Sequence, residues 1–142
     1  MVLEYISISL RFTTLLGDFT DCTGHPLSAK DREKLIATSI EVVKEIGSTV
    51  LEHKILITAD SMTFLSRIQS LPNVYVLPGK VGHIDYDYGD NINIKTFLDF
   101  YMIANAEVVY LTKTPEVYKS AFSETAAMVN DRNFNVIEYD WK

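Results

Sequence analysis

Three polar side chains stand where they could bind an anion together. Arg11 follows a segment in which every second residue is apolar, a pattern that predicts a strand delivering the guanidinium into a loop. A cation beside buried residues is costly unless an anionic group meets it. Ser120 and Ser123 lie at the start of a predicted helix, where hydroxyls and unpaired backbone N–H groups bind anions. If the fold brings them together, these residues predict a site for a phosphate or diphosphate.

Two of these residues, and two acids elsewhere, also have an alternative interpretation. Arg11 could pair with Asp18 or another acid, and Ser123 could serve only as a helix cap. Asp60 follows an apolar run, where it could accept a ribose hydroxyl or cap the next helix. Asp99 lies in a mostly apolar predicted helix and could accept a hydrogen bond from a base or face the solvent. The sequence leaves these alternatives open.

The segment from Pro78 to Asn93 has no regular period and is rich in Gly, Asp and Tyr. His83, Asp85 and Asp87 within it could form a metal or acid–base site, but a polar loop is the interpretation that we favour. The sequence contains no glycine-rich dinucleotide motif and no phosphate-loop Lys, and no Ser-His-Asp arrangement is legible from the spacing. A single cysteine gives no internal disulfide, and no Cys/His spacing indicates zinc. We therefore expect no metal ion and no cofactor.

The composition is that of one globular domain spanning residues 1–142. A net charge of −6, without a cluster of Lys or Arg, argues against nucleic-acid binding. No apolar run is long enough to span a membrane, and the start lacks a signal-peptide pattern, so we expect a cytoplasmic protein. Because strands are predicted close to both ends, we also expect the chain to be a domain of a longer polypeptide.

Short apolar segments alternate with amphipathic ones along the chain. The predicted strands cover residues 2–12, 54–59, 74–77, 108–111 and 134–139, and the predicted helices cover residues 28–47, 61–71, 94–106 and 123–130. We expect Gly47 to end the first helix, and Phe97, Leu98, Tyr101 and Met102 to form the inner face of the third. The alternation predicts an α/β fold: a doubly wound, Rossmann-like sheet of five parallel strands with helices on both faces, most simply in the order 3-2-1-4-5.

In this order the chain reverses direction between the first and fourth strands. Ligands of open parallel sheets bind at the carboxyl ends of such neighbouring strands. The first strand delivers Arg11 to this point, and the fourth strand is followed by the loop that leads to Ser120 and Ser123. The predicted topology therefore brings together the three residues that could bind an anion.

Three regions of the chain resemble motifs of GDP-fucose-dependent fucosyltransferases, the group that contains nodulation and protein O-fucosyltransferases. The Ser-Leu-Arg-Phe run at residues 9–12 is similar to their His-x-Arg region, with Ser9 where that family commonly has His. Residues 57–61 are similar to their second motif, a strand followed by an acid. Residues 97–99 and the Ser-x-Phe-Ser-x-x-Ala run at 120–126 resemble their third region. The resemblance covers nearly the whole chain, as the C-terminal, donor-binding half of a two-domain GT-B enzyme.

The resemblance implies how a diphosphate would be bound. Arg11 would be the catalytic residue, which contacts the β-phosphate of GDP and steadies the leaving group. Ser120, Phe122 and Ser123 would belong to the motif that holds the diphosphate. Such enzymes are usually metal-independent and use the cationic side chain to neutralise the charge that develops on the departing diphosphate.

The resemblance also implies a nucleoside site. Asp99 would accept hydrogen bonds from guanine, and Asp60 would lie beside the nucleoside. Ser9 would be among the substrate-binding residues, although its hydroxyl cannot bond a base as an imidazole does.

The implied function is a sugar-nucleotide-binding domain of a glycosyltransferase, with GDP or a GDP-fucose-like sugar as its partner. Inverting transfer is expected only together with an N-terminal acceptor domain that this chain lacks. The alternative is a non-catalytic nucleotide- or partner-binding module of the same fold, in which Arg11 is structural. Whether the chain is an enzyme stays open at this point. The surface left by a missing domain could also form a homodimer.

Overall fold

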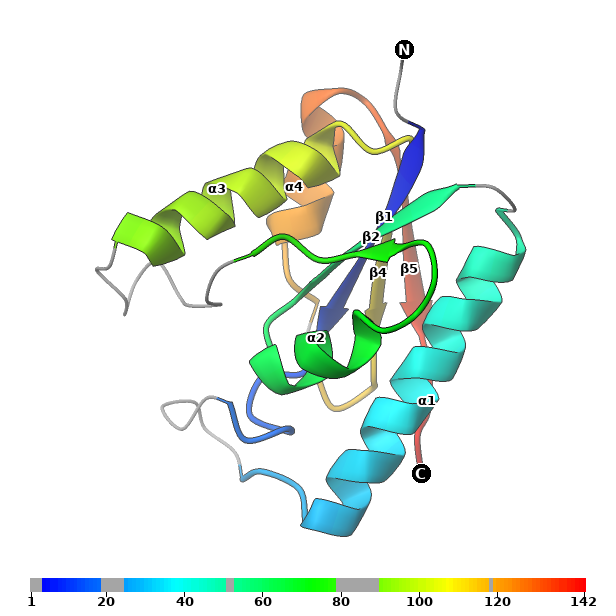
Figure 1. The fold of residues 1–142 in the computed structure, drawn as a ribbon, viewed down its shortest axis with the longest axis vertical. Helices are drawn as coiled ribbons and strands as arrows, with labels where there is room; N and C mark the ends of the chain where they lie inside the picture. Colours follow the sequence, from blue (N-terminus) through cyan, green and yellow to red (C-terminus); the bar gives the residue numbers. More distant parts are fainter. Residues whose placement is uncertain (1–3, 19–24, 51–52, 79–89, 118) are drawn as a thin grey trace.

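A five-stranded sheet forms the centre of the computed structural model, which describes residues 4–18, 25–50, 53–78, 90–117 and 119–142 (Figure 1). The strands are β1 (Tyr5–Arg11), β2 (Lys54–Ala59), β3 (Val74–Tyr75), β4 (Val108–Lys113) and β5 (Asn133–Glu138). All pair in parallel, in the order β3-β2-β1-β4-β5. The predicted fold class, strand number and strand order are therefore confirmed. β3 is shorter than predicted, whereas β4 continues two residues further.

Helices cover both faces of the sheet, as predicted. They are α1 (Ala29–Ser48), α2 (Met62–Ile68), α3 (Asp90–Ala104) and α4 (Phe122–Val129). On one face, Leu35 of α1 and Phe64 of α2 pack with the apolar side chains of β1. On the other face, Ile103 of α3 and Ala126 of α4 pack with Val109 of β4. A fully buried side chain of the size of Leu or Phe contributes about 1.5–3 kcal/mol, so each face is a substantial core.

The central strand β1 shows why the sheet forms here. Its alternate residues Ile6, Ile8 and Leu10 are buried in the core beneath α1 and α2, which confirms the predicted apolar face. The opposite face is polar yet also buried, because α3 and α4 cover it. There the Ser9 hydroxyl lies 2.8 Å from the Thr58 hydroxyl of β2, its partner in the strand register. The bond satisfies two buried hydroxyls that would otherwise be costly.

The ends of the first two helices are set by local chemistry. The Ser28 hydroxyl accepts a hydrogen bond of 3.2 Å from the backbone N–H of Asp31, so the predicted start of α1 is confirmed. Gly47 does not end this helix, which continues to Ser48. A Cβ atom at Gly47 would lie 2.9 Å from Cδ1 of Ile55, so a larger residue here would require the Ile55 side chain to move.

The predicted inner face of α3 is confirmed for Met102, which packs against the core, and is wrong for the other three residues. The side chains of Phe97 and Tyr101 are 67% and 64% exposed, and Leu98 is also exposed. Ile103 and Lys95 are buried instead. Apolar residues occur on every side of this helix, so their spacing does not indicate which side faces the sheet. The helix begins at Asp90, before its predicted start.

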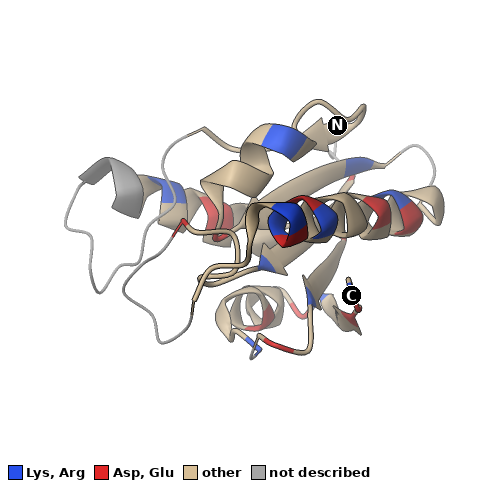
Figure 2. Ribbon diagram, turned by 90° about the horizontal axis from the view of Figure 1, so that it is seen from below, with Lys and Arg blue, Asp and Glu red and all other residues tan. Residues whose placement is uncertain are grey.

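Figure 2 shows Lys and Arg interleaved with Asp and Glu along α1, without a surface reserved for one sign. Among the described residues, no helix combines the length and the apolar character that crossing a membrane requires. His83, Asp85 and Asp87, which we considered as a metal or acid–base group, lie outside the described residues.

Candidate functional site

The carboxyl ends of β1 and β4 place two cations side by side. Arg11 and Lys113 are partners in the strand register, and Lys113 is in turn the partner of Glu138 on β5. In-register residues of parallel strands point to the same face of the sheet, which here is the face covered by α4. Lys113 is buried, and its Nζ lies 2.9 Å from Oε2 of Glu138. We call Arg11, Lys113, Ser120 and Ser123 the switch-point site.

Lys113 was not among the predicted site residues. The fourth strand was predicted to end at Leu111, two residues too early, so Lys113 fell in a loop without a defined neighbour. Lys113 could have been identified from its position along the strand. It lies five residues after Val108, as Arg11 lies five residues after Ile6, so the two become partners once the strands are aligned. Like charges in register repel each other, and here the carboxylate of Glu138 offsets the charge of Lys113.

Asp60 fixes the backbone immediately after Arg11. Its two carboxylate oxygens accept hydrogen bonds from the backbone N–H groups of Phe12 (2.7 Å) and Thr13 (2.9 Å). Burial raises the pKa of Asp60, while these two bonds and the charge of Arg11 act in the opposite direction. Asp60 therefore fixes the backbone of the two residues that follow β1. The interpretation of Asp60 as the cap of the next helix is wrong, because Ser61 is the N-cap of α2.

Asp18, the alternative partner that we considered for Arg11, makes its hydrogen bonds with the start of α2. It accepts hydrogen bonds from the hydroxyls of Ser61 (2.5 Å) and Thr63 (3.0 Å). Both oxygens of Asp18 are thus used near a helix N-terminus, where a negative charge is favourable. The two acids of this region tie the loop after β1 to β2 and α2.

The N-terminus of α4 has donors that the described protein does not satisfy. Its N-cap position is Ala121, which makes no side-chain capping bond, and the interpretation of Ser123 as the cap is wrong. Ser123 is 2% exposed, and its hydroxyl has no hydrogen-bond partner among the described residues. Ser120 accepts one bond, of 3.3 Å, from the backbone N–H of Phe122. A buried hydroxyl without a partner in the described chain, at the positive end of a helix, is suited to an anion.

Phe122 lies where the two helices of this face meet. Its ring packs edge-to-face on Phe100 of α3, with 5.5 Å between the ring centroids. This contact joins the first turn of α4 to the middle of α3. Phe122 is still partly exposed, so one side of the ring remains accessible.

Asp99 forms an ion pair inside α3. Nζ of Lys95 lies 3.0 Å and 3.2 Å from the two carboxylate oxygens of Asp99, and the side chain of Lys95 is only 3% exposed. Burial raises the pKa of Asp99, and the charge of Lys95 opposes that rise. The interpretation of Asp99 as a solvated surface acid is therefore wrong. A carboxylate offers about four acceptor positions, so Asp99 can still accept from another group.

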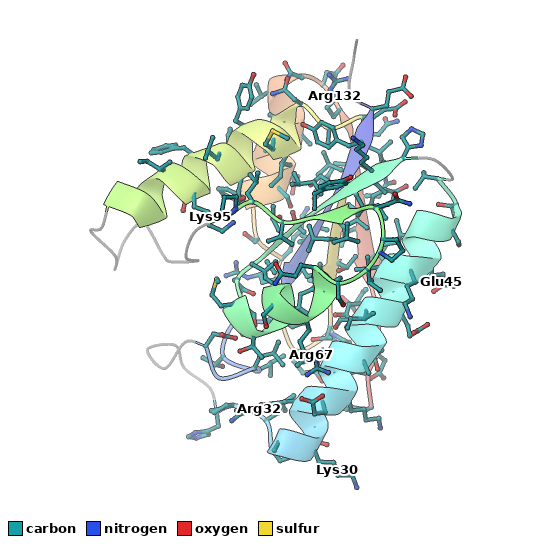
Figure 3. All side chains as sticks on the ribbon, viewed as in Figure 1. Lys30, Arg32, Glu45, Arg67, Lys95 and Arg132 are labelled. Atoms are coloured by element: carbon teal, nitrogen blue, oxygen red, sulfur yellow. The ribbon has the colours of Figure 1, made fainter. Side chains whose placement is uncertain are left out.

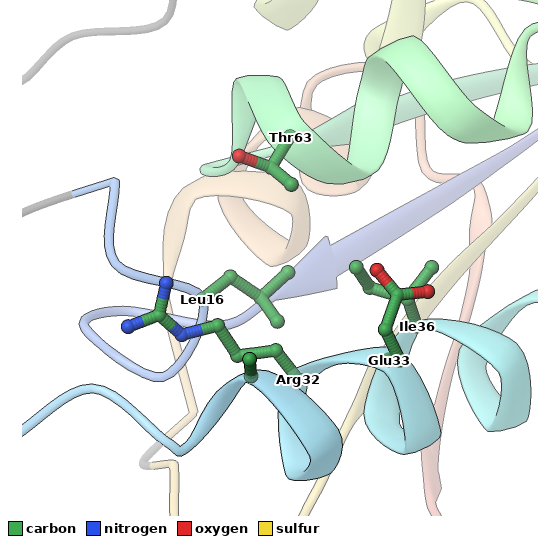
Figure 4. Close-up of a pocket in the computed structure, with 6 residues that line it drawn as sticks. Leu16, Arg32, Glu33, Ile36 and Thr63 are labelled. Carbon is green, nitrogen blue, oxygen red and sulfur yellow. The ribbon is translucent and has the colours of Figure 1, made fainter.

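A separate hollow of about 250 Å³ lies between α1, α2 and the loop after β1 (Figure 4). Its lining residues are Leu16, Ala29, Arg32, Glu33, Ile36 and Thr63. The charged side chains in it are already paired: Arg32 donates to the backbone oxygen of Leu27, and Glu33 lies 3.0 Å from Arg67. It contains none of the predicted site residues, so we assign the site to the α4 side.

Two solved structures resemble this chain in fold. The crystal structure of NodZ α-1,6-fucosyltransferase co-crystallised with GDP superposes with a TM-score of 0.56, and that of the same enzyme soaked with GDP-fucose superposes with 0.55. Sequence identity is 17% in both cases, over 96% of this chain but 38% of the other. No family model and no curated protein matches the chain. The likeness shows that nearly the whole of this chain shares its fold with a part of these fucosyltransferases.

Proposed function

We propose that this chain is the sugar-nucleotide-binding domain of a glycosyltransferase, with GDP or a GDP-fucose-like sugar as its ligand. The observation that carries the proposal is the buried hydroxyl of Ser123, unpaired among the described residues, at the uncapped start of α4. A buried donor without a partner costs about 1–3 kcal/mol, and a bound diphosphate would satisfy it. The fold shared with structures containing GDP and GDP-fucose supports the same ligand class.

Arg11 would act on the leaving group. In an inverting transfer, an acceptor hydroxyl forms a bond to the anomeric carbon while the bond from that carbon to the β-phosphate oxygen breaks. The hydroxyl proton passes to a general base, which the second domain would have to supply. Negative charge then grows on the diphosphate, and a fixed cation beside it lowers the barrier. Arg11 has this role in the proposal, Asp60 holds its backbone in place, and Lys113 adds a second positive charge in the neighbouring register position.

The nucleoside would lie towards α3. We place the guanine at Asp99, which Lys95 holds in one position through the buried ion pair, and we place Phe122 beside it as an apolar wall. Ser9 is bonded to Thr58 beneath these residues. In this scheme Ser9 and Asp60 hold β1 and the loop after it in position through their hydrogen bonds. Ser120 and Ser123 contact the diphosphate.

Transfer would require a second domain that binds the acceptor. The chain spans 38% of the length of the NodZ structures, and we propose that it corresponds to their donor-binding part. On this view the chain alone binds the nucleotide and does not transfer sugar efficiently.

Calorimetric titration of the chain with GDP tests the proposal. We expect saturable binding that weakens about 10-fold to 100-fold in Arg11→Ala, the range for a hydrogen bond to a charged group. Arg132→Ala is the matched control. It removes the same charge, but it lies just before β5, at the opposite end of the sheet (Figure 3), so its affinity should equal that of the wild type.

Two results would decide against the proposal. Failure to bind GDP at about 1 mM would refute nucleotide binding and favour a partner-binding module of the same fold. Equal loss of affinity in the two arginine variants would show that GDP binding depends only on the net charge of the protein and not on the position of Arg11. Titration with UDP in parallel tests the base: a preference for GDP that disappears in Asp99→Asn would support guanine recognition by Asp99.

A further inference from the structure

The amino ends of three adjacent strands bring an imidazole and two carboxylates together. Glu4 precedes β1, His53 precedes β2 and Glu107 precedes β4. The order β2-β1-β4 makes these strands neighbours, and the backbone N–H of Glu107 donates to the carbonyl of Tyr5 (2.9 Å). The sequence separates the three residues widely, so their proximity is a product of the topology. This cluster lies at the amino ends of the strands, whereas the switch-point site lies at their carboxyl ends.

The distances within the cluster suit one shared ion. Nε2 of His53 lies 2.8 Å from Oε2 of Glu107 and 3.9 Å from Oε2 of Glu4. One ligand atom from each residue lies within 4.8 Å of the others. With zinc-to-ligand bonds of about 2.1 Å, two tetrahedral ligands are about 3.4 Å apart. The two observed separations lie on either side of that value.

The remaining adjustment requires only rotation of surface side chains. The side chains of Glu4 and Glu107 are 69% and 50% exposed, whereas the imidazole of His53 is largely covered at 26%. The histidine is thus the fixed ligand, and the two carboxylates can turn towards an ion without disturbing the core. Rotation about the side-chain bonds of the two glutamates would bring each oxygen to a separation from Nε2 of His53 that suits zinc.

We propose that Glu4, His53 and Glu107 form a binding site for a divalent transition-metal ion of the zinc type. Imidazole nitrogen together with carboxylate oxygen favours such ions, whereas Mg²⁺ and Ca²⁺ prefer oxygen ligands alone. A bound ion would cross-link the starts of β2, β1 and β4, the three central strands. The bound ion would stabilise the fold, and its binding does not depend on nucleotide binding at the carboxyl ends of the strands.

Titration of the whole chain with ZnCl₂ tests this site. We expect one ion per chain and an affinity at least about tenfold lower in His53→Gln, since a lost ligand costs at least as much as a lost supporting group. His25→Gln is the control, because His25 is exposed ahead of α1 and outside the cluster. It should bind as the wild type does. Zn²⁺ should also raise the melting temperature of the wild type and of His25→Gln, but not that of His53→Gln.

The proposal is overturned by an absence of saturable binding up to about 1 mM Zn²⁺, or by equal affinity in His53→Gln and the wild type. If His53→Gln does not fold, as judged by circular dichroism, Glu107→Gln decides the question in the same assay. That variant retains the imidazole and an amide of the same shape but loses one carboxylate. Weaker zinc binding in Glu107→Gln supports the site, and unchanged binding refutes it.

Discussion

We expect that Ser123→Ala will stabilise the protein without nucleotide and weaken its binding of GDP. The hydroxyl is buried and has no partner among the described residues, and such a group costs about 1–3 kcal/mol. The substitution removes one oxygen atom, which leaves only a small cavity, and alanine favours the helix. The free energy of unfolding should therefore rise by about 1 kcal/mol, and the melting temperature by about 3 °C. Urea denaturation without ligand measures the first effect.

The loss of affinity follows from the same hydroxyl. A hydrogen bond to a charged group is worth about 1.5–3 kcal/mol, so calorimetry should show GDP binding weakened by about tenfold or more. Ser39→Ala is the control with the opposite sign in stability. Ser39 is also a buried helical serine, but its hydroxyl donates to the Leu35 carbonyl (2.8 Å) and lies 2.5 Å from the Tyr139 hydroxyl.

Ser39→Ala should lower the free energy of unfolding by about 1–2 kcal/mol and leave the affinity for GDP unchanged. The reasoning fails if Ser123→Ala is destabilised like Ser39→Ala, because the hydroxyl would then have a partner in the folded protein. It also fails if Ser123→Ala binds GDP as tightly as the wild type.

Two further predictions concern ionisable groups. Burial raises the pKa of Tyr139 to about 12 from 10.0. The neutral phenol therefore stabilises the fold fully below pH 10 and loses that contribution, about 3 kcal/mol, as the pH rises through 12. Urea midpoints between pH 9 and 12 should therefore fall more steeply in the wild type than in Tyr139→Phe, and parallel curves would contradict this. Asp99→Asn leaves the buried ammonium of Lys95 without its counter-charge and should cost about 3 kcal/mol. The double variant with Lys95→Met should recover most of that loss in urea denaturation, and a double variant as unstable as Asp99→Asn would show that the pair is not the cause.

The topology could be predicted from the sequence because the strands are short, apolar and separated by helices. A parallel sheet with both faces covered is the arrangement that buries such strands, and the order 3-2-1-4-5 is the simplest doubly wound arrangement with right-handed crossovers. The orientation of α3 could not be predicted. Phe97 and Tyr101 are exposed while the charged Lys95 is buried, because Lys95 has Asp99 one turn away to neutralise it. The ion pair between Lys95 and Asp99 therefore had more influence on the orientation of α3 than the spacing of its apolar residues.

The candidate site was predictable only in part, for a similar reason. Arg11 and Ser123 could be placed from strand and helix ends alone. The role of Asp60 depends on backbone groups 48 and 47 residues away, and the cluster of Glu4, His53 and Glu107 depends on strand register. Interactions between residues distant in the sequence become visible only when the strands are aligned.

The predicted site residues differ in whether their polar groups have hydrogen-bond partners within the protein. Asp60 and Asp99 have partners for their carboxylates, as Ser9 has for its hydroxyl, so they contribute to the fold whether or not a ligand is bound. At the switch point, by contrast, the buried hydroxyl of Ser123 has no partner in the described chain, and such a group costs stability. Natural sequences keep such local conflicts mainly where function requires them. An anion at the start of α4 would satisfy this hydroxyl, which is why we propose the diphosphate at this point rather than at the paired acids.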